Sequence, residues 1–362
     1  MRIALLNLQY DNNYGGNLQR YALMTILQRM GHDVTHLNLR FNYNPDPLHK
    51  HPVRFLKKII KKIFINHSLD IFREYKLQKK YYISCRITDM FYNKYIKHTA
   101  IIDSIEKLKK YNNYDIFLVG SDQVWRKSIA AVYGIDTFFF NYLSDSINAK
   151  RIAYGASFGT DENELNTDDL KRLTSLYNRF SAVSVRENSS LRLLSEYGWN
   201  TPEAKWVLDP TLLLEKDDYL KIIKEGETTP SNGNMFCYIL DVTNEKLNLI
   251  NNIAKQKNLI PFKIGINGQE SIEQWLRSFM DAEYVVTDSY HGIVFSIIFN
   301  KPFYLIRNKF RGNARFDAIF KACGLTSDDG KQIDWKEINL NLNKMKLFSK
   351  EWLKQSLKLT KN

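Results

Sequence analysis

The feature that most constrains the fold is a series of short, continuously apolar segments that each end in small or polar residues. In the first half of the chain these segments read RIALLNL, YDIFLVG, RIAYGAS and FSAVSVR, over residues 2–8, 114–120, 151–157 and 180–186. Strands that are apolar throughout, rather than at alternate positions, are typical of parallel sheets covered on both faces. We therefore predict an α/β fold.

The strand and helix pattern occurs twice along the chain. Segment 2–8 is followed by a glycine-rich turn, a helix over 18–31 and a second strand at 33–39, which is a βαβ opening. From residue 205 onward, further apolar strands again alternate with helices. Because 362 residues exceed the usual size of a single hydrophobic core, we predict two domains. They are residues 1–204, with a mostly helical insert at about 44–112, and residues 205–340, followed by a helix at 341–362 that packs back on the first domain.

Several classes of protein are disfavoured by the sequence. The chain has no run of about 18 apolar residues that could cross a membrane, and its first ten residues lack the features of a secretory signal. Its three cysteines lie far apart, without the paired spacing of a zinc site or a disulfide framework. We expect a cytoplasmic protein that binds no metal.

The net charge of +13 is concentrated in one region, since residues 50–80 contain ten Lys or Arg against two acids. Within this region VRFLKKIIKKIF, residues 53–64, places apolar side chains on one helical face and lysines beside it. This pattern favours an interfacial helix over residues 50–65 on an anionic membrane surface, at the inner face of the cell membrane. A helix packed on its own domain with its lysines in water is the alternative. Nucleic acid is not expected as a partner, because no recognised binding motif accompanies the charge.

Polar residues gather where the apolar strands end, which is where open parallel sheets bind ligands. In NNYGGNLQ, residues 12–19, two glycines allow close approach of a ligand to the backbone, and the following helix offers free N–H groups to an anion. The spacing of a dinucleotide fingerprint is absent, and glycines of a tight turn are the alternative. The candidate binding residues here are Asn13, Gly15, Gly16 and Asn17.

Two further strand ends carry candidate binding groups. In VGSDQVW, Asp122 and Gln123 are able to orient sugar hydroxyls while Trp125 stacks on a sugar face, although a capped turn with a buried Trp has the same sequence. In SVRENSS, Arg186 directly follows an apolar strand, where a guanidinium is well placed to bind a carboxylate or a phosphate. The alternative pairs Arg186 with an acid such as Glu187 or Asp209.

The stretch VVTDSYHGI, residues 285–293, combines a strand end with a helix start. Asp288 or Ser289 is able to cap this helix, which places His291 and Gly292 among its unpaired N–H groups. A histidine there is able to donate to a phosphate or to protonate a bound substrate, because its pKa lies near operating pH. A satisfied structural histidine is the alternative. The next strand is followed by a basic run that could supply cations to a doubly negative ligand, and that would otherwise be a solvated charge run: Arg307, Lys309, Arg311 and Arg315.

The ordered set of these motifs resembles the polysaccharide pyruvyl transferase family over roughly residues 1–325. The motifs are NNYGGNLQRYAL, VGSDQVW, SVRENSS, VLDPTLLL, TDSYHGIVFSIIFNKPF and RGNARFDAIF. The resemblance implies two Rossmann-like domains facing each other across a cleft, similar to GT-B glycosyltransferases, with the first domain on the acceptor side and the second on the donor side. It also implies transfer of the pyruvyl group of phosphoenolpyruvate onto two hydroxyls of a sugar, forming a cyclic ketal. The acceptor would belong to a bacterial exopolysaccharide, capsule or cell-wall glycan, or to a lipid-linked precursor.

The resemblance also assigns roles to single residues. It implies that Arg186 and His291 bind the donor, together with Ser289 and Gly292. Many relatives carry Arg where this chain has Ser289, so we expect Arg311 or Arg315 to supply the missing cation. His291 is the candidate acid, and Asp122 or Asp288 the candidate base.

Phosphoenolpyruvate is expected as co-substrate, with no cofactor. Two other functions stay open: a nucleotide-sugar-dependent GT-B glycosyltransferase, and a non-catalytic protein that docks a glycan assembly complex at the membrane.

Overall fold

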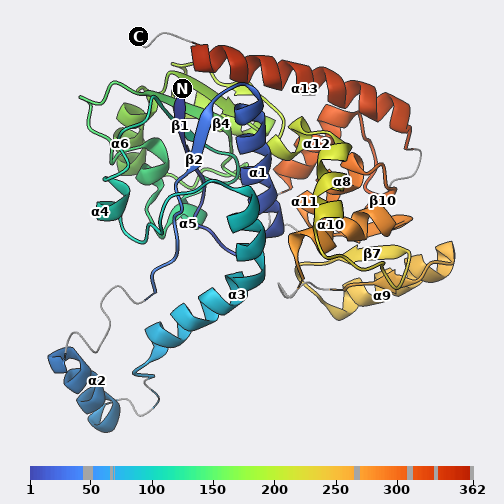
Figure 1. Cartoon of the computed structure of the whole chain (residues 1–362), viewed down its shortest axis with the longest axis horizontal. Helices are drawn as coiled ribbons and strands as arrows, with labels where there is room; N and C mark the ends of the chain where they lie inside the picture. Colours follow the sequence, from blue (N-terminus) through green and yellow to red (C-terminus); the bar gives the residue numbers. More distant parts are fainter. Residues whose placement is uncertain are drawn as a thin grey trace.

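The computed structural model describes residues 1–43, 52–65, 68, 70–264, 270–307, 313–329 and 333–358. It contains two sheets in which all neighbouring strands run parallel (Figure 1). The first has the order β2 (Asp33–His36), β1 (Arg2–Leu6), β3 (Ile116–Val119), β4 (Lys150–Ala156), β5 (Ala182–Val185) and β6 (Lys205–Trp206). The second has the order β10 (Phe303–Leu305), β9 (Tyr284–Thr287), β7 (Met235–Tyr238) and β8 (Pro261–Phe262). The α/β fold predicted from the continuous apolar strands is confirmed.

Both faces of the first sheet are buried, which explains why its strands are apolar throughout. In β1, Ile3 and Leu5 belong to one hydrophobic cluster, while Ala4 and Leu6 belong to another on the opposite face. The second cluster is covered by helices that precede β3 or follow β3, β4 and β5: α4 (Ile105–Leu108), α5 (Lys127–Ala130), η2 (Ile135–Phe139), α6 (Thr167–Tyr177) and α7 (Asn188–Glu196).

The first cluster continues without a break into the second half of the chain. It includes Leu18 from α1 (Tyr14–Arg29), Phe236 from β7 and Phe295 from α11 (Tyr290–Ile298). The two sheets therefore share one hydrophobic core across their junction. The remaining helices of this half are η3 (Pro210–Leu213), α8 (Lys216–Glu225), α9 (Asn244–Lys257), α10 (Ile272–Asp281) and α12 (Ala314–Cys323).

The helix after β1 begins at Tyr14, four residues earlier than the sequence pattern predicts. Asn13 caps it, since its side-chain oxygen accepts a hydrogen bond from the backbone N–H of Gly16 at 3.0 Å. Gly15 and Gly16 consequently lie in the first helical turn and not in a loop. At the other end, the helix stops at Arg29, and Gly31 adopts the left-handed φ of 84° that is common just after a helix.

The last helix, α13 (Trp335–Lys358), contacts both halves of the molecule (Figure 1). It packs on α12 of the second half. Its Ser349 hydroxyl accepts a hydrogen bond from the Leu208 amide at 3.0 Å, and Trp352 contacts Tyr154 of β4.

The described part of the insert includes two long helices, α2 (Pro52–Phe64) and α3 (Arg73–Tyr95). The carboxyl-terminal half of α3 packs on the first domain, while its other end and α2 project away from the body (Figure 1). Among the described residues, no helix has both the length and the apolar character needed to cross a membrane.

Candidate active site

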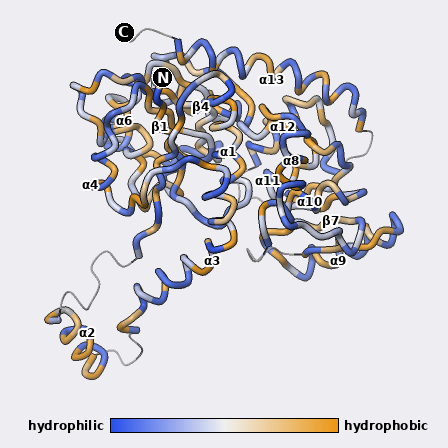
Figure 2. The backbone as a smooth tube through the Cα atoms, in the orientation of Figure 1, coloured by the Kyte–Doolittle hydropathy of each residue, from blue (hydrophilic) through white to orange (hydrophobic). Residues whose placement is uncertain are grey.

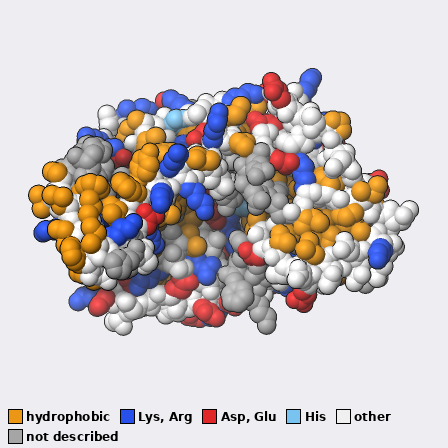
Figure 3. All heavy atoms as spheres, turned by 90° about the horizontal axis from the view of Figure 1, so that it is seen from below, with side chains coloured by type: hydrophobic (Ala, Val, Ile, Leu, Met, Phe, Trp, Pro, Cys, Tyr) orange, Lys and Arg blue, Asp and Glu red, His pale blue; other side chains and the backbone are white. Residues whose placement is uncertain are grey.

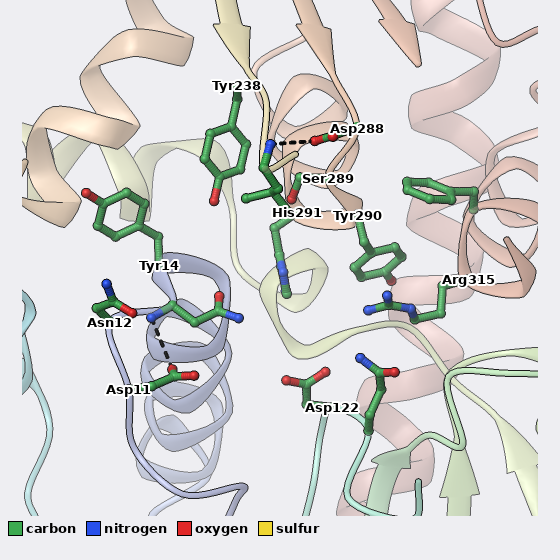
Figure 4. Close-up of a pocket in the computed structure, with 14 residues that line it drawn as sticks. Asp11, Asn12, Tyr14, Asp122, Tyr238, Asp288, Ser289, Tyr290, His291 and Arg315 are labelled. Atoms are coloured by element: carbon green, nitrogen blue, oxygen red, sulfur yellow. Dashed lines mark hydrogen bonds between the residues drawn. The ribbon is translucent and has the colours of Figure 1, made fainter. Parts of the chain in front are cut away.

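A cavity of about 300 Å³ lies between the two halves of the molecule, where strands of both sheets end (Figure 4). Its lining comes from the segment before α1, the turn after β3, the end of β7 and the first residues of α11 and α12. The residues that line it are Asp11, Asn12, Asn13, Tyr14, Asp122, Gln123, Tyr238, Leu240, Asp288, Ser289, Tyr290, His291, Arg315 and Phe316.

The start of α11 forms one wall of the cavity. Ser289 is its N-cap and accepts a hydrogen bond from the Gly292 amide at 3.4 Å. Gly292 is needed for close packing, because a Cβ at this position would lie 2.2 Å from the hydroxyl oxygen of Thr287. Ser289 and the first residues of α11, Tyr290 and His291, line the cavity, so the amino-terminal end of this helix lies at its wall.

His291 extends from α11 across the junction and rests on the first turn of α1. A Cβ on Gly15 would lie 2.0 Å from its Nδ1 atom, so the imidazole occupies the space that this glycine leaves open. Its Nε2 atom has no hydrogen-bond partner within the described part of the chain. Burial lowers the pKa of His291 to about 4, although Asp209 and Asp122 act in the opposite direction. Without a ligand, the ring is neutral at physiological pH.

Arg315 lies beside His291 and reaches the cavity from the start of α12 (Figure 4). Its guanidinium carbon lies 5.4 Å from the centroid of the Tyr290 ring. Burial, together with the nearby Arg186, lowers the pKa of Arg315 to about 10, which leaves it charged at neutral pH. This residue therefore brings a cation to the cavity wall that contains Ser289. Arg311, the other candidate, lies outside the described residues.

Arg186 is placed differently from the prediction that it contacts a ligand. Its side chain is 1% exposed and does not line the cavity. The guanidinium donates to Asp209 at 2.7 Å and to Asp122 at 2.8 Å, and it lies 3.7 Å from Glu187. Burial opposes its charge, but Asp122 and Asp209 raise the pKa of Arg186 above its usual value. These contacts match the alternative of an internal ion pair.

The three candidate ligand-binding residues in the turn after β3 lie in different surroundings. Asp122 and Gln123 line the cavity. Burial would raise the pKa of Asp122, but Arg186 and Arg315 lower it overall, so the carboxylate is ionised. Trp125 is fully buried in the hydrophobic core and stacks on Phe139, with ring centroids 5.0 Å apart. It cannot stack on a sugar in this position, because the core covers it.

The candidates near α1 also divide into cavity residues and structural residues. Asn13 lines the cavity as well as capping the helix. Asn17 is buried, and its side-chain amide donates to the backbone oxygens of Asp11 and Asn13. Gly15 and Gly16 do not line the cavity.

Asp288 lies in the cavity wall, but its carboxylate is directed away from the space. It accepts hydrogen bonds from the amides of Leu240 and Asp241 and from Lys246 Nζ, at 2.7, 3.2 and 2.6 Å. With these donors in place, the carboxylate joins α11 to the end of β7. The geometry does not favour Asp288 as a base.

Asp11 is the main residue that sequence reasoning missed. It precedes the glycine motif, lines the cavity and accepts a hydrogen bond from the Asn13 amide at 3.1 Å. Burial raises the pKa of Asp11, against the opposing effect of Arg20. In a sequence, an Asp just before an Asn-rich turn is typical of a residue that stabilises the turn. Only the folded structure therefore identifies Asp11 as a cavity residue. In the described residues, no group of three or more His, Cys, Asp or Glu could hold a metal ion.

Comparisons with known proteins agree on fold and family. The family model described as polysaccharide pyruvyl transferase matches residues 13–309. No curated protein matches the chain. Among solved structures, a Listeria monocytogenes protein assigned as a UDP-N-acetylglucosamine 2-epimerase is similar at a TM-score of 0.50 and 11% identity, covering 98% of this chain and 90% of that one. The UDP-GlcNAc 2-epimerase of Methanocaldococcus jannaschii has a TM-score of 0.49 at 11% identity, with coverage of 95% and 92%. At 11% identity, the likeness to the Listeria structure shows the fold alone, a GT-B type of architecture.

Proposed function

Since this chain belongs to the polysaccharide pyruvyl transferase family, we propose that it transfers the pyruvyl group of phosphoenolpyruvate onto two hydroxyls of a sugar, forming a cyclic ketal. The observation that carries the proposal is the division of charge across the cavity. Cationic and N–H donors come from the second half of the chain, at Arg315 and the start of α11, while the carboxylates of Asp11 and Asp122 come from the first half.

The second half of the chain offers what the donor needs. Phosphoenolpyruvate carries a carboxylate and a phosphate, which bind best to guanidinium groups and to oriented N–H donors. Arg315, Ser289 and the first amides of α11 supply these groups. Arg186 of the first half acts indirectly, because it holds Asp122, a carboxylate on the opposite side of the cavity.

The groups in the cavity are able to supply and remove every proton that the proposed reaction needs. His291 delivers a proton to the methylene carbon of the donor, and C2 becomes electrophilic. One sugar hydroxyl adds to C2 and loses its proton, the bond from C2 to the phosphate oxygen breaks, and the second hydroxyl adds and loses its proton. Of the two protons released, one replaces that of His291 and one leaves with phosphate. We assign their removal to Asp122 and Asp11, which face the cavity from the acceptor side.

Donor binding should be accompanied by uptake of a proton at His291. The ring is neutral when the site is empty, because burial lowers its pKa to about 4. An anionic donor beside the ring raises this pKa, so binding draws a proton and strengthens as pH falls. Calorimetry of phosphoenolpyruvate binding near pH 8, where a phosphate monoester with a second pKa of about 6 is ionised, should give heats that depend on the buffer. The His291→Gln variant should lose this dependence, and a dependence equal in both proteins would contradict the assignment.

The acceptor is a sugar, and we propose that it is presented as a polysaccharide or lipid-linked precursor at the cytoplasmic face of a membrane. The family supports a glycan acceptor. A lipid-linked acceptor would fit the predicted membrane contact of the basic insert.

The decisive experiment supplies purified protein with phosphoenolpyruvate and a pool of bacterial glycans. We expect phosphate release and a sugar product that has gained one pyruvate less one water by mass spectrometry. A chelator should leave the rate unchanged, because the proposed reaction uses no metal. Release of a nucleotide from a nucleotide sugar would instead support a glycosyltransferase, and absence of either reaction would support a non-catalytic docking protein.

A further inference from the structure

The projecting part of the insert is a small unit with its own internal contacts. It comprises residues 52–65 and 70–83, called the arm below. Lys58 of α2 forms an ion pair with Glu74 of α3 at 2.8 Å, and the rings of Phe55 and Phe72 lie 6.1 Å apart. These contacts hold α2 against the free end of α3. Half-buried Ile59 lies on the same side as Phe55.

The outer side of α2 is an apolar stripe with no cover from the described part of the chain. The members of the stripe recur at helical spacing, so they share one face. Each is more than half exposed: Val53, Leu56, Ile60, Ile63 and Phe64. Exposed apolar side chains continue at Ile65, Phe72 and Tyr75. Figures 2 and 3 show apolar residues gathered on the projecting end of the molecule. A contiguous exposed apolar patch of this kind marks an interaction surface.

The charge of the arm identifies the kind of surface that it fits. Residues 52–65 carry five basic side chains and no acidic one. Lys57 and Lys61 lie next to the apolar stripe and are exposed. An apolar stripe bordered by lysines is suited to the interface of an anionic leaflet, where the stripe enters the acyl boundary and the lysines meet the headgroups. A protein partner with an acidic rim would need a groove that complements the convex surface of α2. A lipid surface needs no such groove.

The arm is fixed to the molecule beside the cavity. The Tyr81 hydroxyl of α3 donates to the backbone oxygen of Tyr10 at 2.6 Å, and Asp89 pairs with Arg40 at 2.8 Å. Tyr10 directly precedes Asp11, which lines the cavity. A membrane bound by the arm is therefore held at a defined position relative to the site.

We propose that the arm docks the protein on an anionic lipid surface, by insertion of the α2 stripe, and keeps the cavity beside that surface. Docking itself is independent of the reaction catalysed. Its purpose, access to a lipid-linked sugar, rests on the proposed function.

The first test measures docking alone. Wild-type protein should float with vesicles of equal parts phosphatidylcholine and phosphatidylglycerol, and should not float with phosphatidylcholine alone. Two variants should weaken binding by about tenfold or more: Lys57→Glu with Lys61→Glu and Lys62→Glu, and Leu56→Ser with Ile60→Ser and Ile63→Ser. Both sets leave the Lys58–Glu74 pair intact. The matched control changes exposed residues of α13, Lys344→Glu with Leu340→Ser and Leu347→Ser, and should bind as wild type.

A second measurement locates the contact. The three native cysteines are buried, so an Ile63→Cys variant can be labelled selectively with an environment-sensitive dye. Its emission should shift to the blue on anionic vesicles, while dye on Leu340→Cys should not respond.

Three results would overturn the proposal. The first is that wild-type protein does not bind anionic vesicles, and the second is that the α13 control loses as much vesicle binding as the arm variants. The third is a concentration-dependent dimer that the variant with Leu56→Ser, Ile60→Ser and Ile63→Ser abolishes while its vesicle binding persists. The reaction is scored separately with a water-soluble glycan. Arm variants should keep wild-type rates there and lose activity only toward acceptor presented on vesicles, so failure of docking and failure of pyruvyl transfer give different results.

Discussion

Replacing Gly15 with alanine is expected to lower kcat/KM for pyruvyl transfer by about 100-fold, the loss that a displacement of about 1 Å can cause at a reacting group. The added Cβ would lie 2.0 Å from His291 Nδ1 and 2.2 Å from its Cγ atom, well inside van der Waals contact. The imidazole must therefore move, and with it the unpaired Nε2 atom. Steady-state kinetics of phosphate release measures the effect.

The neighbouring glycine provides a matched control. In Gly16→Ala the nearest neighbouring atom to the new Cβ would be Nη1 of Arg20, at 3.5 Å, which is an ordinary contact. Both changes put alanine in the first turn of α1, where it favours the helix by about 1 kcal/mol. Gly16→Ala should keep wild-type kinetics. Equal activity of both variants would show that the position of His291 does not matter to the reaction.

Replacing Arg186 with alanine is expected to reduce the free energy of unfolding by about 3–5 kcal/mol, the usual effect of breaking a buried ion pair from one side. The change leaves the carboxylates of Asp209, which is fully buried, and of Asp122 without their guanidinium partner. Urea denaturation measures the loss. An exposed control is Arg192→Ala, which removes a surface pair with Glu196 and should cost about 0.5 kcal/mol or less.

The same variant should reverse part of the pH dependence of stability. In the wild-type protein burial raises the pKa values of Asp122 and Asp209, but Arg186, together with weaker neighbouring charges and hydrogen bonds, lowers both overall in the folded state. These groups therefore stabilise the fold above the pKa of an unfolded Asp, and the stabilisation is lost as pH falls through the folded values. Without Arg186, burial raises both pKa values, so the deficit of the variant should grow as pH rises from about 4 to 7. Adding Asp209→Asn should recover part of it. A deficit that is small and independent of pH would instead indicate that Arg186 is free to bind a ligand.

The fold could be predicted because strands in a sheet that is buried on both faces are apolar at every position, and this pattern is visible in the sequence. Segments such as residues 116–119 are apolar at every position, and the structure places them in parallel sheets. The start of α1 was harder to predict. Its two glycines suggest a loop, and only the Asn13 cap and the space required by His291 explain why they lie in a helix.

The site was partly predictable for a related reason. Polar residues after buried strands must either bond to one another or face a cavity, and sequence spacing does not distinguish these outcomes. His291, Asp122, Gln123 and Arg315 face the cavity. Arg186 and Trp125 follow the same kind of strand but are satisfied internally, by distant Asp209 and by the aromatic core. Their partners lie far away in the chain, so tertiary structure decides.

The shared hydrophobic core limits which parts can be exchanged between members of the family. α1 of the first half packs on η3, and its Gly15 accommodates a histidine from the second half. α13 then contacts β4 and α12 on either side of the junction. A chimera that joins the first half of one family member to the second half of another would bring together surfaces that had never been matched. For this architecture, the smallest unit that can be transplanted with its activity is both halves together.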